Sequence, residues 1–395
     1  MRALLRHCCH GALIAGLALV TTPSAPVRAQ GIGGFETSAS SAFVRDLTTG
    51  TILLEKNADT PLPPASMSKL MTLLMLFEAI EDGRMALDTP FTVSQRAYAM
   101  GGSRMFLEPT DRPTAEDLIR GIAVLSGNDA SVVVAEGLAG TEEAFARMAT
   151  RRAQELGMRN TTLINSSGWP DPDHMMSKRD LAILAEHLIT EYPDYYTYLS
   201  EPEFTWNNIP QSNRVPLLGA GVGLDGLKTG FTSAAGYSLT GSAEQDGRRV
   251  VFAFGGLNSE GARAREAEAI INWAFRQFAK VTVAEEGTVL AEAPVWLGEA
   301  DTVPLVVARD ADVLIPAVAQ RSLEARVVYE GPLPAPITQG DELGMLVIDI
   351  PEMDEARIPL IAGASVAEGG FAVRAEAAAR RLVGLMLSQA QDRPN

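Results

Sequence analysis

The sequence predicts an α+β protein in which an antiparallel sheet is covered by helices, one cluster is entirely helical, and a small all-β domain follows. Apolar residues recur at helical spacing in several runs between residues 67 and 191, and strand-like runs lie before and after them. Past about residue 279, short β-rich runs alternate with Gly, Pro and Asp, and no long helix interrupts them. The 395 residues are enough for two domains, each with its own core.

Residues 1–29 are interpreted as a secretory signal peptide. A basic start, MRALLRHCCH, precedes the ten-residue apolar core GALIAGLALV, and the segment ends in the small-x-small pattern Val27-Arg28-Ala29. The apolar core is short for a membrane span, and a retained anchor is the alternative. Cleavage would remove both cysteines, which excludes disulfides, thiolate metal sites and a cysteine nucleophile. It would leave 30 basic against 49 acidic residues, a balance that disfavours nucleic-acid binding.

The next segment, residues 30–278, begins with a predicted hairpin and a buried helix. Two apolar-rich strands in SSAFVRDLTTGTILLEKNADT flank a turn at Thr48-Thr49-Gly50. PLPPAS then breaks the strand pattern. Helical spacing of apolar residues from Met67 to Ile80 predicts a helix whose N-terminus lies at Ser66.

Further helices and then strands follow in order. Residues 114–126 predict a helix with a capping box at Thr114 and Asp117, and Ser177 predicts the cap of a later one. Between them, helices are expected in VVVAEGLA and in EEAFARMATRRAQELG. Strands are expected in GLDGLKTGFT, GYSLTGSAEQ and RRVVFAFGGL, the last two joined by a turn at Asp246-Gly247. The run EAEAIINWAFRQF predicts a closing helix.

The remaining chain divides into a β-rich domain, residues 279–372, and a tail, residues 373–395. Strands are expected in VTVAE, VPLVVA, ARVVYE, GMLVIDI and ARIPLIA, and residues 280–372 hold 5 basic and 16 acidic residues without a catalytic constellation. This composition favours a structural or positioning role. The tail predicts an amphipathic helix with arginines beside its apolar face; it either lies in a membrane interface or docks on its own protein.

Histidine chemistry has little support. After removal of the signal peptide only His174, in a turn-rich loop, and His187, in a helical run, remain, and they lack metal-binding spacing. A zinc hydrolase and a serine–histidine–acid hydrolase are therefore disfavoured. No metal and no organic cofactor is expected.

Lysine is scarce in this chain, which directs attention to Lys69. The sequence has five lysines against 28 arginines, and Lys69 follows Ser66 by three residues. On a helix these positions are neighbours, so a lysine that has lost its proton could take the proton of the serine hydroxyl. Arginine cannot do this, because it keeps its proton. Ser-x-x-Lys alone is a weak signal, but the scarcity of lysine lowers its chance rate.

Two further tripeptides strengthen this signal. Ser126-Gly127-Asn128 falls in a break between two predicted helices, and Lys228-Thr229-Gly230 lies on a predicted strand. Each is trivial alone, and an ordinary cap or turn would explain it. Their order and setting are typical of penicillin-binding proteins and class A β-lactamases, whose middle motif is Ser-Asp-Asn.

With these motifs the chain resembles the low-molecular-mass penicillin-binding proteins, specifically the D-alanyl-D-alanine carboxypeptidases. Their usual middle motif is Ser-Gly-Asn. The resemblance covers roughly residues 35–279 and includes PASMSKLMT, GGSRMFLEPTD, LIRGIAVLSGNDAS, ELGMRNTTLINSSGWPD, FTWNNIPQSNR, LDGLKTGFTSAAGYSL and REAEAIINWAF. It implies a penicillin-binding transpeptidase fold for residues 30–278, and the β-rich segment and tail match the longer members.

The resemblance also implies roles for individual residues. It makes Ser66 the acylated nucleophile, Lys69 its general base and Ser126 a proton relay. The substrate would be bound by Asn128, Lys228, Thr229, Gly230 and Arg214, and the backbone amides of Ser66 and Phe231 would form the oxyanion hole. Many relatives have histidine at the position of Phe231, and NRVPLLG departs from their asparagine-glycine-rich pattern, so substrate contacts there are open.

The function implied is removal of the terminal D-alanine from peptidoglycan stem peptides, with β-lactams as covalent inhibitors. A class A-like β-lactamase would need a Glu-x-x-Leu-Asn element between Ser126 and Lys228, and there is none. An endopeptidase of the same clan usually lacks the β domain, and a non-enzymatic wall-binding protein would not need the serine and lysines. The expected location is the periplasm, on the inner-membrane surface through the tail helix.

Overall fold

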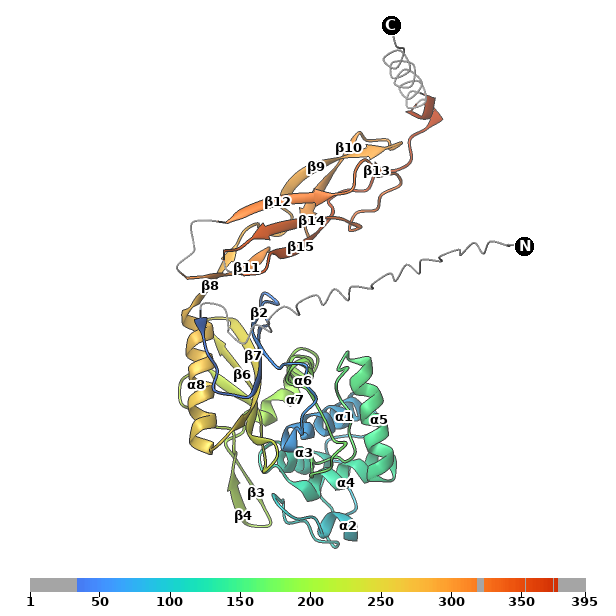
Figure 1. Cartoon of the computed structure of the whole chain (residues 1–395). Coiled ribbons are helices and arrows are strands. Elements are labelled where there is room, and N and C mark those ends of the chain that lie inside the picture. The colour runs from blue at the N-terminus through green and yellow to red at the C-terminus, as the bar shows by residue number, and fades with distance from the viewer. Residues whose placement is uncertain (1–33, 318–322, 352, 372, 376–395) are drawn as a thin grey trace, which may run out of the picture.

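The computed structural model describes residues 34–317, 323–351, 353–371 and 373–375. The proposed signal peptide and nearly all of the tail helix lie outside the described residues. The chain forms an α/β part, residues 34–277, and an elongated β-rich part that begins at residue 278 and extends away from it (Figure 1). Among the described residues, no helix is both long enough and apolar enough to cross a membrane.

A five-stranded antiparallel sheet, in the order β2-β1-β7-β6-β5, forms the centre of the α/β part. Its strands are β1 (Ser41–Asp46), β2 (Ile52–Lys56), β5 (Leu224–Thr232), β6 (Gly236–Gln245) and β7 (Arg248–Leu257). The predicted first hairpin is confirmed, as is the turn between β6 and β7, where Asp246 and Gly247 have φ of 51° and 72°. Strand β5 lies at one edge, so its outer side is not paired with another strand.

Helices cover both faces of this sheet. The helices of this part are α1 (Lys69–Glu81), α2 (Gln95–Tyr98), α3 (Ala115–Ala123), α4 (Asn128–Ala139), α5 (Glu142–Glu155), α6 (Lys178–Glu191), α7 (Pro193–Tyr196) and α8 (Glu260–Arg276). Along β7, Val251 and Ala253 pack with the helical cluster, whereas Phe252 and Phe254 pack with α8 on the opposite face. This alternation follows from the two-residue period of a strand. The predicted α+β class is confirmed.

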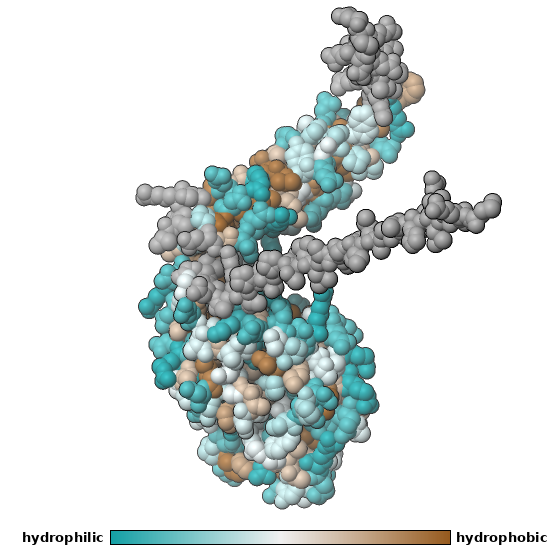
Figure 2. Space-filling view, viewed as in Figure 1, coloured by the Kyte–Doolittle hydropathy of each residue, from teal (hydrophilic) through white to brown (hydrophobic). Residues whose placement is uncertain are grey.

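The predicted caps are confirmed, and the outer helix shows why its sequence is amphipathic. Thr114 and Asp117 form a capping box at α3, and the Ser177 side chain accepts a hydrogen bond from the backbone of Asp180 at α6. Helix α5 buries Phe145 and Ala149, and Glu142 at its start is also buried; its later charged residues face outward, where Figure 2 shows a hydrophilic margin. Helices α2 and α7 and the hairpin β3 (Glu203–Trp206)–β4 (Ile209–Ser212) were not predicted.

One expected boundary is wrong. The chain forms a 3₁₀ turn at Ala65–Ser68, and the α-helix begins only at Lys69, so Ser66 is not the helix N-terminus. Pro64 occupies the cap position of the turn, and Ala65 has φ of 51°. Proline has no N–H and fixes its own φ, so a tight turn forms before the helix can start. The Ser66 side chain caps nothing.

The β-rich part has a sheet and a core of its own. Its six strands have the order β12-β14-β15-β10-β9-β13, and a separate pair joins β8 to β11. The strands are β8 (Phe278–Thr282), β9 (Val289–Trp296), β10 (Thr302–Val307), β11 (Asp312–Pro316), β12 (Glu324–Tyr329), β13 (Leu333–Pro334), β14 (Glu342–Asp349) and β15 (Ala356–Ala362). The five predicted strands are confirmed, whereas β9, β11 and β13 were missed.

The junction between the two parts is packed. Only Gln277 separates α8 from β8, and Leu314 of β11 belongs to the same hydrophobic cluster as α8. The buried Arg248 forms an ion pair with Asp46 in β1 at 2.5 Å. It also donates hydrogen bonds to the backbone carbonyls of Ala274 in α8, at 2.7 Å, and of Phe278 in β8, at 3.4 Å. Removal of one partner of a buried ion pair costs about 3–5 kcal/mol, so the pair holds Arg248 where it contacts both α8 and β8.

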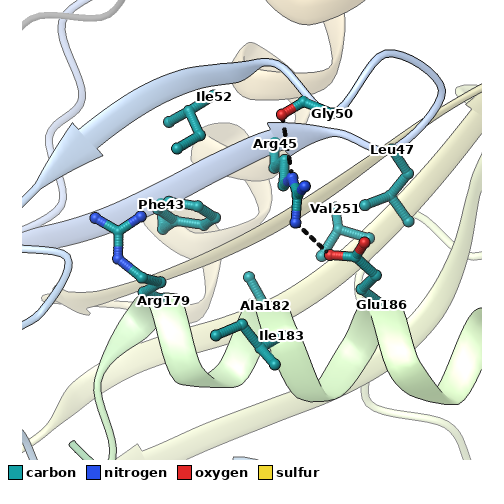
Figure 3. Close-up of a pocket in the computed structure, with 10 residues that line it drawn as sticks. All are labelled: Phe43, Arg45, Leu47, Gly50, Ile52, Arg179, Ala182, Ile183, Glu186 and Val251. Atoms are coloured by element: carbon teal, nitrogen blue, oxygen red, sulfur yellow. Dashed lines mark hydrogen bonds and ion pairs between the residues drawn. The ribbon is translucent and has the colours of Figure 1, made fainter. Parts of the chain in front are cut away.

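A cavity of about 240 Å³ lies between α6 and the sheet (Figure 3). Across it, Arg45 donates hydrogen bonds to the Gly50 carbonyl and to Glu186, and the Arg179 guanidinium lies over the Phe43 ring at 4.7 Å. None of the predicted site residues lines this cavity. We therefore treat it as part of the packing of α6.

Lys178, the first residue of α6, is a buried lysine that forms no ion pair with a described residue. Burial lowers its pKa to about 8, from an ordinary value of 10.5. The native state therefore loses this proton before the unfolded state does, and stability rises with pH between about 8 and 10.5. Below about pH 8 Lys178 is charged in the native state, and the full cost of burying this charge lowers the free energy of unfolding.

We expect Lys178→Met to raise the free energy of unfolding by about 2 kcal/mol near pH 6.5 and by much less near pH 10, because the lysine is then neutral. Urea unfolding at the two pH values measures the difference. Lys280→Met is the control, since Lys280 is partly exposed and pairs with Asp312. Destabilisation by Lys178→Met at the lower pH, or equal stabilisation at both, would contradict the prediction.

Candidate active site

The nucleophile candidate Ser66 lies where the 3₁₀ turn meets the edge strand β5. The strand passes so close to the turn that a Cβ at Gly230 would lie 2.8 Å from the Pro64 carbonyl oxygen. Glycine is therefore required in the third motif for packing. Gly168 closes the other side of the turn: it has φ of 75°, and a Cβ there would lie 1.9 Å from the Ala65 carbonyl oxygen.

Lys69 lies beside Ser66 in the position that the sequence predicts. Its Nζ is 2.9 Å from Ser66 Oγ and donates a hydrogen bond to the Ser167 carbonyl at 2.5 Å. Lys69 is fully buried. Burial lowers its pKa well below the ordinary value, and the positive charges of Lys228 and Arg214 lower it further. These effects favour the neutral amine next to the hydroxyl, which is the form that a general base needs.

Three cations gather near the middle of β5. Lys228 is buried, and burial together with the charges of Arg214 and Arg263 lowers its pKa to about 7. Arg214 is exposed and donates a hydrogen bond to Ser103 Oγ. A negatively charged ligand would favour the protonated form of Lys228. The cluster is therefore suited to bind a carboxylate.

Arg263 was missed in the sequence. It lies on α8, is 6% exposed, and its guanidinium lies 5.7 Å over the Tyr237 ring. Its Nε is buried and has no hydrogen-bond partner among the described residues. A single arginine in an amphipathic helix carries no signal of its own; only the packing of α8 against β6 brings it towards Lys228.

The second motif forms a rigid corner between α3 and α4. Ser126 is buried with φ of 60°, the Gly127 N–H donates to the Gly121 carbonyl, and the Asn128 side chain donates to the Gly101 carbonyl at 2.8 Å. The Ser126 hydroxyl has no hydrogen-bond partner among the described residues. Asp129 accepts backbone hydrogen bonds at 2.8 and 3.1 Å, which hold the facing loop. The corner is held from both sides, and the Ser126 hydroxyl is left for a substrate.

Thr229 and Phe231 follow on β5. Thr229 is buried, whereas the Phe231 ring is 54% exposed and packs against Tyr237, with centroids 4.3 Å apart and the ring planes tilted by 33°. Because β5 is an edge strand, amides on its outer side are available to a bound peptide.

In the part of the chain that the structure describes, neither histidine forms a hydrogen bond with Ser66, Lys69 or Lys228. His187 lies in α6, as predicted. His174, expected in a loop without a partner, is buried, and its Nδ1 accepts a hydrogen bond from the backbone N–H of Ile164 at 3.1 Å. Within the described residues, no group of three or more His, Cys, Asp or Glu side chains could hold a metal ion.

Comparison with known proteins identifies the family. The profile described as D-alanyl-D-alanine carboxypeptidase matches residues 21–256. The chain belongs to this family. The profile described as penicillin-binding protein 5, C-terminal domain, matches residues 278–368, the β-rich part. This carboxypeptidase family member is also 33% identical to the D-alanyl-D-alanine carboxypeptidase DacC of Escherichia coli over 92% of its own length and 94% of that protein.

Further relatives and solved structures indicate the same family. The carboxypeptidase DacF of Bacillus subtilis is 32% identical over 91% of this chain and 94% of that protein. Penicillin-binding protein 5 from Haemophilus influenzae superposes with a TM-score of 0.80 at 31% identity, covering 86% of this chain and 100% of that one. Penicillin-binding protein D2 from Listeria monocytogenes in an ampicillin-bound form superposes with a TM-score of 0.57 at 29% identity, covering 62% and 99%.

Proposed function

We propose that the protein is a serine-type D-Ala-D-Ala carboxypeptidase that removes the terminal D-alanine from peptidoglycan pentapeptide stems through an acyl-enzyme on Ser66. The observation that carries this proposal is the 2.9 Å contact between Ser66 Oγ and the buried Nζ of Lys69. The neighbouring cations Lys228, Arg214 and Arg263 fit the free carboxylate with which such a stem ends.

In the acylation step, neutral Lys69 takes the proton of Ser66 while Oγ attacks the carbonyl carbon of the penultimate D-alanine. The backbone amides of Ser66 and Phe231 receive the negative charge on the carbonyl oxygen. The C–N bond then breaks, and the proton that Lys69 took up passes by way of Ser126 to the amine of the departing D-alanine, which leaves Lys69 neutral again.

Binding of the peptide is assigned to the residues around this step. Lys228 and Thr229 hold the terminal carboxylate, with charge from Arg214 and Arg263 nearby. Asn128 contacts the peptide backbone. Gly230 lets the strand approach the turn that carries Ser66.

In the deacylation step, Lys69 takes a proton from water as the water oxygen attacks the ester carbonyl, the C–O bond to Ser66 breaks, and Lys69 gives that proton to Ser66 Oγ. No carboxylate among the described residues is hydrogen-bonded to Ser66 or Lys69. The buried Glu142 instead accepts hydrogen bonds from Ser166 and pairs with Arg96. A β-lactam ester on Ser66 therefore lacks a dedicated carboxylate to activate water, which favours lasting inhibition over β-lactamase activity. The ampicillin-bound relative supports β-lactam binding.

Release of D-alanine from a diacetylated Lys-D-Ala-D-Ala peptide tests the activity. We expect release by the wild type and none above background by Ser66→Ala. Absence of release by the wild type, with Ser66 still acylated by penicillin, would show that the machinery is right and the substrate wrong; crosslinked dimers, the endopeptidase substrate, would then be assayed. Equal penicillin labelling of Ser66→Ala would overturn the choice of nucleophile.

We further propose that the protein is exported with removal of residues 1–29 and acts in the periplasm, held at the inner-membrane surface by residues 373–395. The signal pattern and the amphipathic tail support this. The first residues of this tail, 373–375, lie at the end of the β-rich part that is far from the α/β part (Figure 1). Cell fractionation tests the proposal, and recovery of the protein in the cytoplasm would refute it.

A further inference from the structure

We propose that a cavity beside Ser66 binds the side chain of the diamino acid that precedes D-Ala-D-Ala in the stem peptide, and that Asp171 recognises its terminal ammonium group. This inference rests on the proposed function, because it takes the direction of the peptide from the positions of the nucleophile and the cations. It adds a recognition residue that none of the three motifs contains.

The cavity has a volume of about 360 Å³ and three walls. They are formed by Pro63–Ala65, by the loop Gly168–Pro172 with His174, and by residues 232–234 after β5. Ala65 precedes the nucleophile directly, and Gly168 packs against the carbonyl of Ala65. The cavity therefore adjoins the nucleophile on one side. Its volume is in the range of ordinary small-ligand sites.

The direction of the peptide follows from β5. With the terminal carboxylate at Lys228 and the reacting carbonyl beside Ser66, the rest of the peptide must run towards Thr232. At roughly 3.3 Å per residue, Thr232 lies about 13 Å from Lys228 along the strand. The residue before D-Ala-D-Ala is two positions from the terminal one, about 7 Å away in an extended peptide. Its side chain can therefore enter the cavity.

The walls suit an aliphatic chain that ends in a cation. The Trp169 indole is 46% exposed and lies against Gly101, whose carbonyl accepts the Asn128 side-chain hydrogen bond. This ring thus separates the peptide-binding corner from the cavity. Together with the prolines it offers an apolar surface for methylene groups, and an indole attracts an ammonium over its face.

Two polar side chains that line the cavity have unused binding capacity among the described residues. Asp171 lines it, is half-buried and forms no ion pair with a described residue; one of its oxygens accepts a hydrogen bond from the Asp173 N–H at 2.9 Å. His174 also lines the cavity and is 2% exposed. Because Nδ1 accepts from Ile164, the proton lies on Nε2, and Nε2 has no partner among the described residues. An unpaired buried donor is costly, so a bound peptide that supplies an acceptor would relieve it.

The test compares three peptides that differ only in the residue before D-Ala-D-Ala: lysine, Nε-acetyl-lysine and norleucine. Asp171→Asn keeps the shape and the contact with the Asp173 N–H but removes the charge. Asp173→Asn is the matched control, because Asp173 is exposed and does not line the cavity. All measurements use the same purified protein that the activity assay uses.

We expect the wild type to prefer the lysyl peptide over the other two in kcat/KM by about three- to fivefold, the effect of a partly exposed charge pair. Asp171→Asn should lower kcat/KM for that peptide by the same factor and leave the norleucyl peptide within about twofold. Asp173→Asn should change neither. Equal loss on all three peptides, or no loss on any, would overturn the inference. Failure of the wild type to release D-alanine from any peptide would instead overturn the proposed function.

Discussion

Replacing Lys69 with arginine is expected to slow acylation of Ser66 by at least about 1,000-fold while the protein stays folded, since general base catalysis contributes up to about 10⁴-fold. Burial, followed by the positive charges of Lys228 and Arg214, lowers the pKa of Lys69 and so favours its neutral form. Arginine does not lose its proton under these conditions. The variant would therefore hold a hydrogen bond to Ser66 but could not accept its proton.

The second-order rate of labelling by a fluorescent penicillin measures this effect, and thermal unfolding checks the fold. Because Lys69 is fully buried and arginine is larger, Lys69→Met serves as a second variant of similar volume without a base. Both variants should lose labelling to a similar degree. Wild-type labelling by either folded variant would show that Lys69 is not the base.

Replacing Lys228 with methionine is expected to lower kcat/KM for D-Ala-D-Ala peptides by about 100- to 1,000-fold, because a buried partner of the terminal carboxylate is lost. A second effect follows from the pKa of Lys69. The Lys228 charge holds that pKa down, so its removal raises it. The rate should then begin to rise at a higher pH than in the wild type, since a larger fraction of Lys69 is protonated at any given pH.

The pH dependence of kcat/KM between about 5 and 10 separates the two effects, because this profile reports ionisations of the free enzyme. A peptide with an amidated C-terminus lacks the carboxylate, so its loss in Lys228→Met should be smaller than that of the free acid. Lys280→Met controls for the loss of one lysine elsewhere. If the acid limb of Lys228→Met stayed in place or moved to lower pH, the electrostatic role of Lys228 would be refuted.

Local patterns predicted those parts of the fold that local physics determines. The capping box at Thr114 and the turn at Asp246-Gly247 are set by neighbouring residues, and both appear as expected. The start of α1 was misplaced because Pro64 imposes a tight turn that apolar spacing does not reveal. Short elements such as β3 and β4 have too few residues to show a period.

For the same reason, the sequence predicted only part of the candidate site. Ser66 and Lys69 are three residues apart, so helix geometry alone predicts their contact. Arg263 and Asp171 carry no motif, and they reach the site through the packing of α8 and through a loop that closes over Gly168. Their contribution depends on tertiary distances, which composition and spacing do not encode.

The packed junction at Arg248 has a mechanical consequence. If a flexible linker joined the two parts, the active site could rotate freely relative to the β-rich part, and only its distance from that part would be limited. Here α8 passes directly into β8. Arg248 donates a hydrogen bond to the backbone carbonyl of Phe278 in β8, and Leu314 of β11 packs in the same hydrophobic cluster as α8. The two parts therefore move as one rigid unit. If the far end of the β-rich part is held in place, the orientation of the active site is held as well. Insertion of a flexible linker after Gln277 would leave hydrolysis of a free peptide unchanged but would remove this directional control over an immobile, polymeric substrate.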